Sequence, residues 1–239
     1  MSATELLYMA GVEGNYIKEF EAVVTERGPG WVALDRTAFY AEGGGQPSDT
    51  GELVFEGGRA RVTDVQKRDT VRHFIDGELP QHVKSVRGIL DWERRYAHMR
   101  MHTAQHVLSG VVFDRFGART VGNQIHADRS RIDFFPLALA PEDLESLEEA
   151  CNSIFARNVP LEIYEEDRAE LEKRVNVGRV SLDLLPKSVR RLRIIKIGEF
   201  DFCPCAGTHV RTTAEIGRMK IIKKESKGRD RERLVYTLV

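Results

Sequence analysis

Two histidines and a cysteine–histidine pair are the residues of this chain best suited to chemistry. His102 and His106 lie four residues apart, and Cys205 and His209 repeat that spacing farther along the chain. Residues four apart on a helix share one face, with Cβ atoms roughly 5–6 Å apart, so two imidazoles can reach one ion. Imidazole and thiolate ligands favour zinc over calcium or magnesium. The spacing therefore predicts one shared zinc site.

A further histidine complicates this ligand set. His98 lies four residues before His102 and could replace one of the ligands. We expect it instead to cap the approach to the site or to face solvent. No glutamate lies between His102 and His106, so the pattern is not the H-E-x-x-H of metalloproteases, in which that glutamate is the general base.

A third stretch, residues 36–51, contains the consecutive glycines Gly43, Gly44 and Gly45. Glycines permit positive φ and close approach of the backbone. The stretch lacks the Lys-Ser/Thr ending of a phosphate-binding P-loop. Its side chains able to hydrogen-bond are Glu42, Gln46, Ser48 and Asp49. These side chains favour a loop shaped to touch another group over a flexible hairpin.

Composition is that of an ordinary globular chain. Of its 239 residues, 41% are hydrophobic and 31% are charged, and the net charge is −1, so no global basic field indicates a nucleic-acid partner. We expect no membrane segment and no signal peptide, because no long apolar run is present. Three cysteines give no disulfide framework, which favours the cytoplasm, where thiols stay reduced.

The elements that must position these residues fall into two halves. Residues 20–25, 31–34, 51–55, 59–63, 71–75 and 85–90 predict short strands separated by turn signals such as Gly57-Gly58 and Asp76-Gly77. Several short strands at close spacing predict a small β-barrel domain over residues 1–91. Residues 92–239 are predicted to form an α+β domain.

A long helix should carry the histidine pair. From residue 92 to about 116 the chain lacks proline, and its only glycine is Gly110. Apolar residues recur at intervals of three and four, which predicts an amphipathic helix that Gly117 ends, with both histidines at the rim of a core. Beyond it we expect helices from Pro141 to about 157 and at 167–174. Strands are expected at 161–164, 191–197, 215–224 and 234–239.

Three runs of sequence together resemble the editing region of alanyl-tRNA synthetase and its free-standing relatives, the AlaX-type trans-editing proteins. The runs are residues 35–51 (DRTAFYAEGGGQPSDTG), 91–106 (DWERRYAHMRMHTAQH) and 205–209 (CAGTH). The resemblance covers nearly the whole chain. It is closest in kind to the medium-length class, which has the barrel domain and lacks a long C-terminal extension.

This resemblance implies hydrolysis of the ester that joins a wrong amino acid to tRNA(Ala), chiefly serine, with glycine as a second candidate. A pocket built for alanine gains only roughly 1–3 kcal/mol against a smaller rival and rejects an added hydroxyl weakly, so a second, hydrolytic site is needed. We expect no aminoacylation domain in this chain. We therefore expect it to act on tRNA(Ala) that a synthetase has already charged.

Carried over by position, the resemblance implies one Zn²⁺ per chain, held by His102, His106, Cys205 and His209. A catalytic zinc usually has three protein ligands and a place for water. Four ligands leave three alternatives: one is loose, the metal takes five ligands, or the metal only positions the substrate. We expect a partly open site with His209 as the weakest ligand.

Recognition of serine needs a polar partner for its hydroxyl. Close relatives place a threonine after the helix of the histidine pair, and counting from Gly117 puts that position at Asn123, with Thr120 nearby. Thr103, Gln105 and Gln124 are alternatives. The glycine-rich motif, with Gly43, Gly44, Gly45, Gln46 and Asp49, is expected to lie against the zinc domain and shape the same pocket.

Contacts with tRNA should be electrostatic. One basic run contains Lys187, Arg190, Arg191 and Arg193, and the C-terminal run includes Lys223, Lys224 and Lys227. Local basic clusters permit phosphate binding in spite of a neutral net charge.

Two other classes of function remain open. One is a non-catalytic, zinc-stapled module that binds tRNA or a synthetase, and the other is a metal hydrolase of another small ester. Hydrolysis of mischarged tRNA, measured beside a free aminoacyl ester, separates the three. The sequence does not indicate an oligomeric state.

Overall fold

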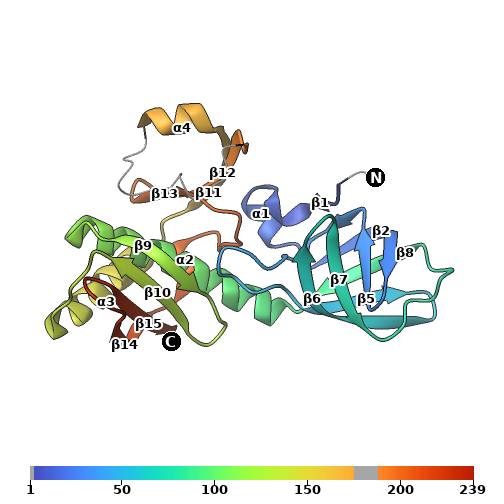
Figure 1. Cartoon of the computed structure of the whole chain (residues 1–239), viewed down its shortest axis with the longest axis horizontal. Helices are drawn as coiled ribbons and strands as arrows, with labels where there is room; N and C mark the ends of the chain where they lie inside the picture. The colour runs from blue at the N-terminus through green and yellow to red at the C-terminus, as the bar shows by residue number, and fades with distance from the viewer. Residues whose placement is uncertain (1–2, 175–187) are drawn as a thin grey trace. The chain divides into compact units, whose positions relative to one another are not determined.

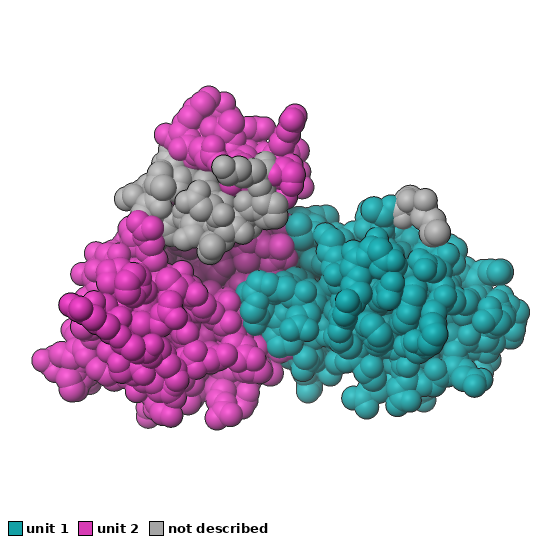
Figure 2. Space-filling view, in the orientation of Figure 1, with its two compact units in different colours: residues 1–97 teal, residues 98–239 magenta. Residues whose placement is uncertain are grey.

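The computed structural model describes residues 3–174 and 188–239 (Figure 1). Internal contacts divide the chain into two compact units, residues 1–97 and residues 98–239 (Figure 2). The predicted domain boundary after residue 91 coincides with the start of helix α2 (Trp92–Phe116), whereas the division by contacts cuts that helix. The helix is thus the covalent link between the units.

The first unit is built on a closed six-stranded barrel. Its strands are β2 (Glu19–Gly28), β3 (Trp31–Leu34), β5 (Gly51–Phe55), β6 (Gly58–Lys67), β7 (Val71–Asp76) and β8 (Ser85–Leu90). They close in the order β2-β3-β7-β6-β5-β8, with every neighbouring pair antiparallel. The predicted barrel is confirmed, and each predicted strand lies within one of the six.

Buried apolar side chains form the core of the barrel. Leu34, Leu53 and Val62 are fully buried in its core, together with Phe39. Gly88 on β8 leaves room for a ring, because a Cβ there would come 2.3 Å from Phe20 Cε1. Short elements precede and join the barrel strands, namely β1 (Glu5–Leu6), η1 (Leu7–Met9), α1 (Gly11–Asn15) and β4 (Arg36–Thr37). Strand β1 pairs in parallel with β4.

The second unit contains most of α2 and a four-stranded sheet. The sheet has the order β14-β15-β10-β9, from β9 (Arg119–Gln124), β10 (Ser130–Phe135), β14 (Met219–Ser226) and β15 (Glu232–Leu238). Helix α3 (Pro141–Ala156) contacts β14. The Tyr236 hydroxyl on β15 donates to the Met101 carbonyl, 2.8 Å away, which ties the sheet to α2.

A smaller antiparallel sheet supports the cysteine–histidine segment. Its order is β11-β12-β13, from β11 (Leu161–Asp167), β12 (Arg191–Ile197) and β13 (Asp201–Pro204). Helix α4 (Arg168–Arg174) follows β11, and the short helix η3 (Thr213–Ile216) precedes β14. Leu171, Leu192 and Ile194 form the local core. Strand β13 ends one residue before Cys205.

Two expectations about these elements were wrong. Helix α2 is not amphipathic at its centre, because every residue from 101 to 108 is buried, so the histidines lie inside the unit and not at a rim. The strand expected from residue 215 starts at Met219, since residues 213–216 form η3, where a capping box stops strand pairing. Strands β9, β10 and β13 were not predicted.

Among the helices of the described part of the chain, none is long and apolar enough to cross a membrane.

Candidate metal centre

Four side chains converge in the second unit. His102 and His106 project from α2, while Cys205 and His209 come from the segment after β13. Their candidate ligand atoms all lie within 4.8 Å of one another. The ring centroids are 5.3 Å apart for His102 and His106, 4.5 Å for His102 and His209, and 4.7 Å for His106 and His209. The predicted convergence is confirmed, and the donor set fits one metal ion.

The cysteine is held by its own loop. Cys205 Sγ lies 3.5 Å from His102 Nε2 and accepts a hydrogen bond from the Gly207 amide at 3.3 Å. Arg193 on β12 donates from Nη1 to the carbonyls of Cys205 and Gly207, at 2.8 and 2.9 Å. Its side chain is buried, so the expectation that Arg193 belongs to a basic surface run was wrong. Arg193 instead fixes the loop that presents Cys205.

Thr103 fixes the tautomer of His209. Its hydroxyl donates to the Met99 carbonyl at 2.8 Å and accepts from the Val210 amide at 3.3 Å. Because a hydroxyl has one proton, His209 Nδ1, 3.2 Å away, must be the donor in its contact with Thr103 Oγ1. The lone pair of His209 then lies on Nε2, as a metal ligand requires. The helix position predicted to meet substrate therefore serves a histidine.

His106 has two neighbours that sequence reasoning missed. Its Nδ1 lies 3.1 Å from Cys203 Sγ and 3.6 Å from Asp201 Oδ2. Asp201 is buried, and the three groups form a second cluster of potential ligands. The available signal was the Cys203-Pro-Cys205 sequence, in which two thiols lie two residues apart.

The electrostatics favour cation binding. Burial alone would raise the pKa of the Cys205 thiol, but His102, with help from His106 and His209, brings that pKa well below its usual range. Burial and the charge of His102 hold the pKa of His209 well below its usual value. A thiolate and a neutral imidazole are the forms that bind metals.

His106 differs from His209 in its protonation. Burial disfavours its charged form, yet Cys203, Asp201 and Cys205 outweigh burial and hold the pKa of His106 well above its usual value. The Asp201 carboxylate and the Cys205 thiolate attract a proton to this ring, and the same negative charges favour a metal cation in place of the proton.

We expected His98 to cap the approach to the site or to face solvent, but it does not face solvent. Its side chain is 1% exposed, because this part of α2 is buried. It is also not a member of the four-residue donor group found among the described residues.

A line of polar pairs joins the histidine face of α2 to strand β9. His102, Gln105, His106 and Ser109 share one helical face by their spacing. Asn123 Nδ2 donates to Gln105 Oε1 at 2.7 Å, and the hydroxyls of Ser109 and Thr120 lie 2.9 Å apart. The structure thus brings together Gln105, Thr120 and Asn123 of the predicted pocket residues. Gln124 instead accepts from Arg131 Nε at 2.9 Å.

The three consecutive glycines Gly43, Gly44 and Gly45 belong to a tight turn. The Gly43 amide donates to the Gln46 carbonyl at 3.1 Å, and the Gln46 amide donates to the Gly43 carbonyl at 2.9 Å. Gly44 and Gly45 have φ of +58° and +82°, as both central residues of a type I′ turn require. The geometry of the turn therefore explains why glycine occupies these two positions, apart from any contact with a ligand.

The end of the glycine-rich motif is internal. Asp49 and Arg95 are both fully buried and form an ion pair, with Arg95 Nε 2.9 Å from Asp49 Oδ2. Asp49 Oδ2 also accepts from the Tyr40 amide at 2.7 Å, and Arg95 Nη1 donates to the Asn15 carbonyl at 2.9 Å. Gln46 is fully buried as well. Asp49 thus ties the glycine-rich motif to Arg95 of helix α2 within the first unit.

Most of the predicted tRNA contacts have intramolecular partners. Lys223 and Lys227 both pair with Glu225 at 2.6 Å, and Arg191 pairs with Glu165 at 3.0 Å. Lys224 Nζ donates to the Leu139 carbonyl. Arg190 is exposed, and Lys187 lies outside the described residues.

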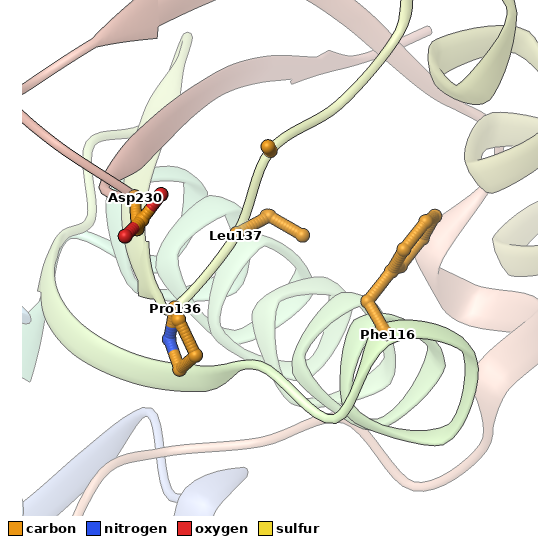
Figure 3. Close-up of a pocket in the computed structure, with 5 residues that line it drawn as sticks. Phe116, Pro136, Leu137 and Asp230 are labelled. Atoms are coloured by element: carbon orange, nitrogen blue, oxygen red, sulfur yellow. The ribbon is translucent and has the colours of Figure 1, made fainter.

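A separate surface hollow of about 220 Å³ lies near the end of α2. It is lined by Phe116, Pro136, Leu137, Ala138 and Asp230 (Figure 3). Phe116 is ten residues beyond His106 on the helix, which corresponds to about 15 Å along its axis. None of the predicted substrate residues lines this hollow.

The protein is thus a two-unit chain. Its first unit is a six-stranded barrel, and its second unit contains a candidate metal site built from three histidines and one cysteine. Residues 8–94 match the family model "tRNA synthetases class II (A)". Residues 192–235, which include Cys205 and His209, match the family model "Threonyl and Alanyl tRNA synthetase second additional domain".

Comparison with individual proteins identifies the family to which the chain belongs. The chain is 39% identical to the alanyl-tRNA editing protein AlaX-M of Methanosarcina barkeri over 99% of both chains. It is 36% identical to AlaX-M of Saccharolobus solfataricus, over 98% of this chain and 99% of that protein. An alanine–tRNA ligase of Pyrobaculum calidifontis is 38% identical over 98% of this chain but only 26% of the ligase. The chain belongs to the AlaX-M family of alanyl-tRNA editing proteins.

Proposed function

We propose that this protein is a trans-editing hydrolase that deacylates mischarged tRNA(Ala), chiefly Ser-tRNA(Ala) with Gly-tRNA(Ala) as a second substrate, at a zinc centre. Four converging donors, in a chain that belongs to a family of alanyl-tRNA editing proteins, carry the proposal. Cysteine and three histidines are borderline-to-soft ligands, and zinc is the metal that suits such a set. His102, His106, Cys205 and His209 would hold one ion.

Zinc, when bound, supplies Lewis acidity toward the ester. The chain's own residues supply the rest. Cys205 is disposed to be a thiolate and His209 to be neutral, so both are ready to bind. Arg193 and Thr103 hold those two side chains in place. The hydrogen bond to Thr103 restrains His209, and its role as the weakest ligand stays a prediction.

Gln105 and Asn123 are our candidates for recognition of the serine hydroxyl. They already bond to one another next to His106. A serine hydroxyl can join this amide pair, whereas the methyl group of alanine cannot. One unpaired buried polar group costs about 1–3 kcal/mol, which corresponds to roughly tenfold to a hundredfold discrimination. Sparing of alanine should therefore be a matter of degree.

The partner we propose is tRNA(Ala) carrying a non-cognate amino acid, in the cytoplasm, where free thiols stay reduced. All three cysteines are free. Arg190, Arg191, Lys223, Lys224 and Lys227 remain the candidates for phosphate contacts. A contribution of the Gly43–Gly45 turn to the editing pocket stays a prediction.

Deacylation tests the proposal directly. Ser-tRNA(Ala), Gly-tRNA(Ala) and Ala-tRNA(Ala) should be timed side by side with a free seryl ester. We expect Ser-tRNA(Ala) to be hydrolysed at least tenfold faster than Ala-tRNA(Ala). His102→Ala should abolish the activity, and His126→Ala, which changes an exposed histidine of the same unit, should retain it.

The other outcomes identify the alternatives. Binding of tRNA without hydrolysis would indicate a zinc-stapled binding module. Equal rates on the free ester and on Ser-tRNA(Ala) would indicate a hydrolase of small esters. Metal analysis should find about one zinc per chain, and full zinc occupancy in Cys205→Ala would refute the ligand set.

A further inference from the structure

The two cysteines of the Cys203-Pro-Cys205 segment have different surroundings. Cys205 belongs to the donor group with His102, His106 and His209. Cys203 belongs to the second group, with Asp201 and His106, so His106 is the one residue common to both groups. The two thiols therefore reach the same imidazole from positions two residues apart.

The second group gathers at one nitrogen of His106. Cys203 Sγ lies 3.1 Å from Nδ1, and Asp201 Oδ2 lies 3.6 Å from the same atom. Both acceptors come from β13, and Asp201 is only 7% exposed. Strand β13 pairs with β12 at Cys203–Ile195 and Asp201–Ile197, so a ladder of hydrogen bonds fixes both residues.

A histidine that binds a metal through one nitrogen commonly donates from the other to a carboxylate or similar acceptor, which fixes ring orientation and tautomer. We propose that Asp201 and Cys203 are positioning residues that hold His106 by Nδ1–H, so that its Nε2 is the ligating atom. The inference rests on the metal centre of the proposed function. His209 is held in the same manner, since Thr103 engages its Nδ1.

This assignment gives the cysteines separate roles. Cys205 is a ligand, while Cys203 acts through His106 and touches no metal. The carboxylate of Asp201 and the sulfur of Cys203 share one N–H, so each can compensate in part for loss of the other. Removal of both should therefore have a larger effect than removal of either.

Zinc affinity, measured by competition with a chromogenic chelator, tests the assignment. The Asp201→Ala, Cys203→Ala double variant, which removes both hydrogen-bond acceptors, should bind zinc about 10–100-fold more weakly than the wild type. Cys203→Ser should stay close to the wild type, because its hydroxyl still accepts a hydrogen bond. Glu199→Ala is the matched control, since that acidic side chain, two residues from Asp201, is 95% exposed and pairs with Lys196.

Cobalt substitution supplies a readout that folding alone does not move. The sulfur-to-cobalt charge-transfer band should persist in Cys203→Ala and disappear in Cys205→Ala. Loss of the band in Cys203→Ala as well would overturn the assignment, because Cys203 would then be a ligand. Binding of two zinc ions by the wild type, with one lost in the double variant, would also overturn it, because the second group would then be a metal site.

Failure of this inference differs from failure of the proposed function. A double variant with wild-type zinc affinity would refute the positioning role, even if the wild type deacylates Ser-tRNA(Ala). A wild type that binds zinc tightly, loses affinity in the double variant and hydrolyses no aminoacyl-tRNA would support the positioning role and refute the function. If the double variant does not fold, the two single variants Asp201→Ala and Cys203→Ala decide, and wild-type zinc affinity in both would refute the positioning role.

Discussion

At the scale of single residues, His73 in the barrel is a histidine committed to its neutral form. Its Nδ1 donates to the Val32 carbonyl at 3.2 Å, and its Nε2 accepts from the Thr37 hydroxyl at 2.8 Å. Burial lowers the pKa of His73 to about 4, against the opposing effect of the Val32 carbonyl. Protonation would bury a charge where a hydrogen-bond acceptor is required.

The first unit should therefore lose stability in mild acid. Between pH 6.5 and pH 4 the unfolded state binds more protons at His73 than the folded state. The stabilising contribution is thus complete above pH 6.5 and is lost as the pH falls towards 4. From pH 7 to pH 5 we expect a loss of about 2 kcal/mol in the free energy of unfolding.

Urea unfolding, followed by tryptophan fluorescence, measures this loss. Both tryptophans, Trp31 and Trp92, lie in the first unit. His73→Gln should remove most of the pH dependence, and His82→Gln, which changes an exposed histidine, should leave it intact. The same loss of stability in His73→Gln as in the wild type would contradict the assignment to His73.

The four donors of the centre could be predicted, because their types and spacing are local. Thr103 could not be assigned in the same way. Its hydroxyl contacts His209 and Val210, more than a hundred positions away in the chain, and no local pattern distinguishes that contact from one to a substrate. Asp201 was missed for a similar reason, since its proximity to His106 depends on the pairing of β13 with β12.

At the scale of elements, the buried ion pair between Asp49 and Arg95 connects the glycine-rich segment to the start of α2. Removal of one partner of such a pair leaves an uncompensated charge in the interior and costs about 3–5 kcal/mol. Asp49→Ala should destabilise the first unit by that amount. The same urea unfolding assay measures it.

An exposed pair of the same unit is the control. Asp69 and Arg72 lie 2.8 Å apart, but the Asp69 side chain is 67% exposed. Asp69→Ala should cost at most about 1 kcal/mol. A loss in Asp49→Ala no larger than in Asp69→Ala would show that the buried pair contributes little to the stability of the folded first unit.

Elements with strong periodicity could be predicted, and those built from polar pairs could not. Barrel strands such as β2, β6 and β8 alternate buried residues with more exposed ones between turn signals, and the sequence displays this pattern directly. Strand β9 contains Gly122 and ends in Asn123 and Gln124, which are poor strand formers, so no strand was predicted there. Strand β13 is four residues long and ends in a proline. Its existence depends on β12 beside it.

At the scale of the whole molecule, the net charge of −1 reflects 36 Lys and Arg residues against 37 Asp and Glu residues. Hydrogen bonds from Lys223 and Lys227 lower the pKa of Glu225 to about 2, so this carboxylate stays charged throughout the physiological range. One acidic residue thus opposes two of the predicted phosphate contacts. A negative charge among cations weakens attraction to an RNA backbone.

Neutralisation of that carboxylate should strengthen tRNA binding. We expect Glu225→Gln to lower the KM for Ser-tRNA(Ala) by about two- to fivefold at low salt, with kcat unchanged and the gain fading as salt screens the charges. Kinetics at two salt concentrations check this. Glu52→Gln, which removes the partner of Arg59 on the barrel, is the control. Equal effects of the two substitutions would show that only net charge matters.

Helix α2 limits where this protein can be divided into fragments. Asp91 Oδ1 accepts from the Arg94 amide at 3.2 Å and so caps the helix within the first unit, yet the helix delivers His102 and His106 in the second. A fragment that begins at residue 98 would start inside a helical turn, without its cap, one turn before the first ligand. The boundary between the compact units is therefore a poor place to truncate the chain. Protein fragments meant to isolate the metal-binding unit should retain residue 91.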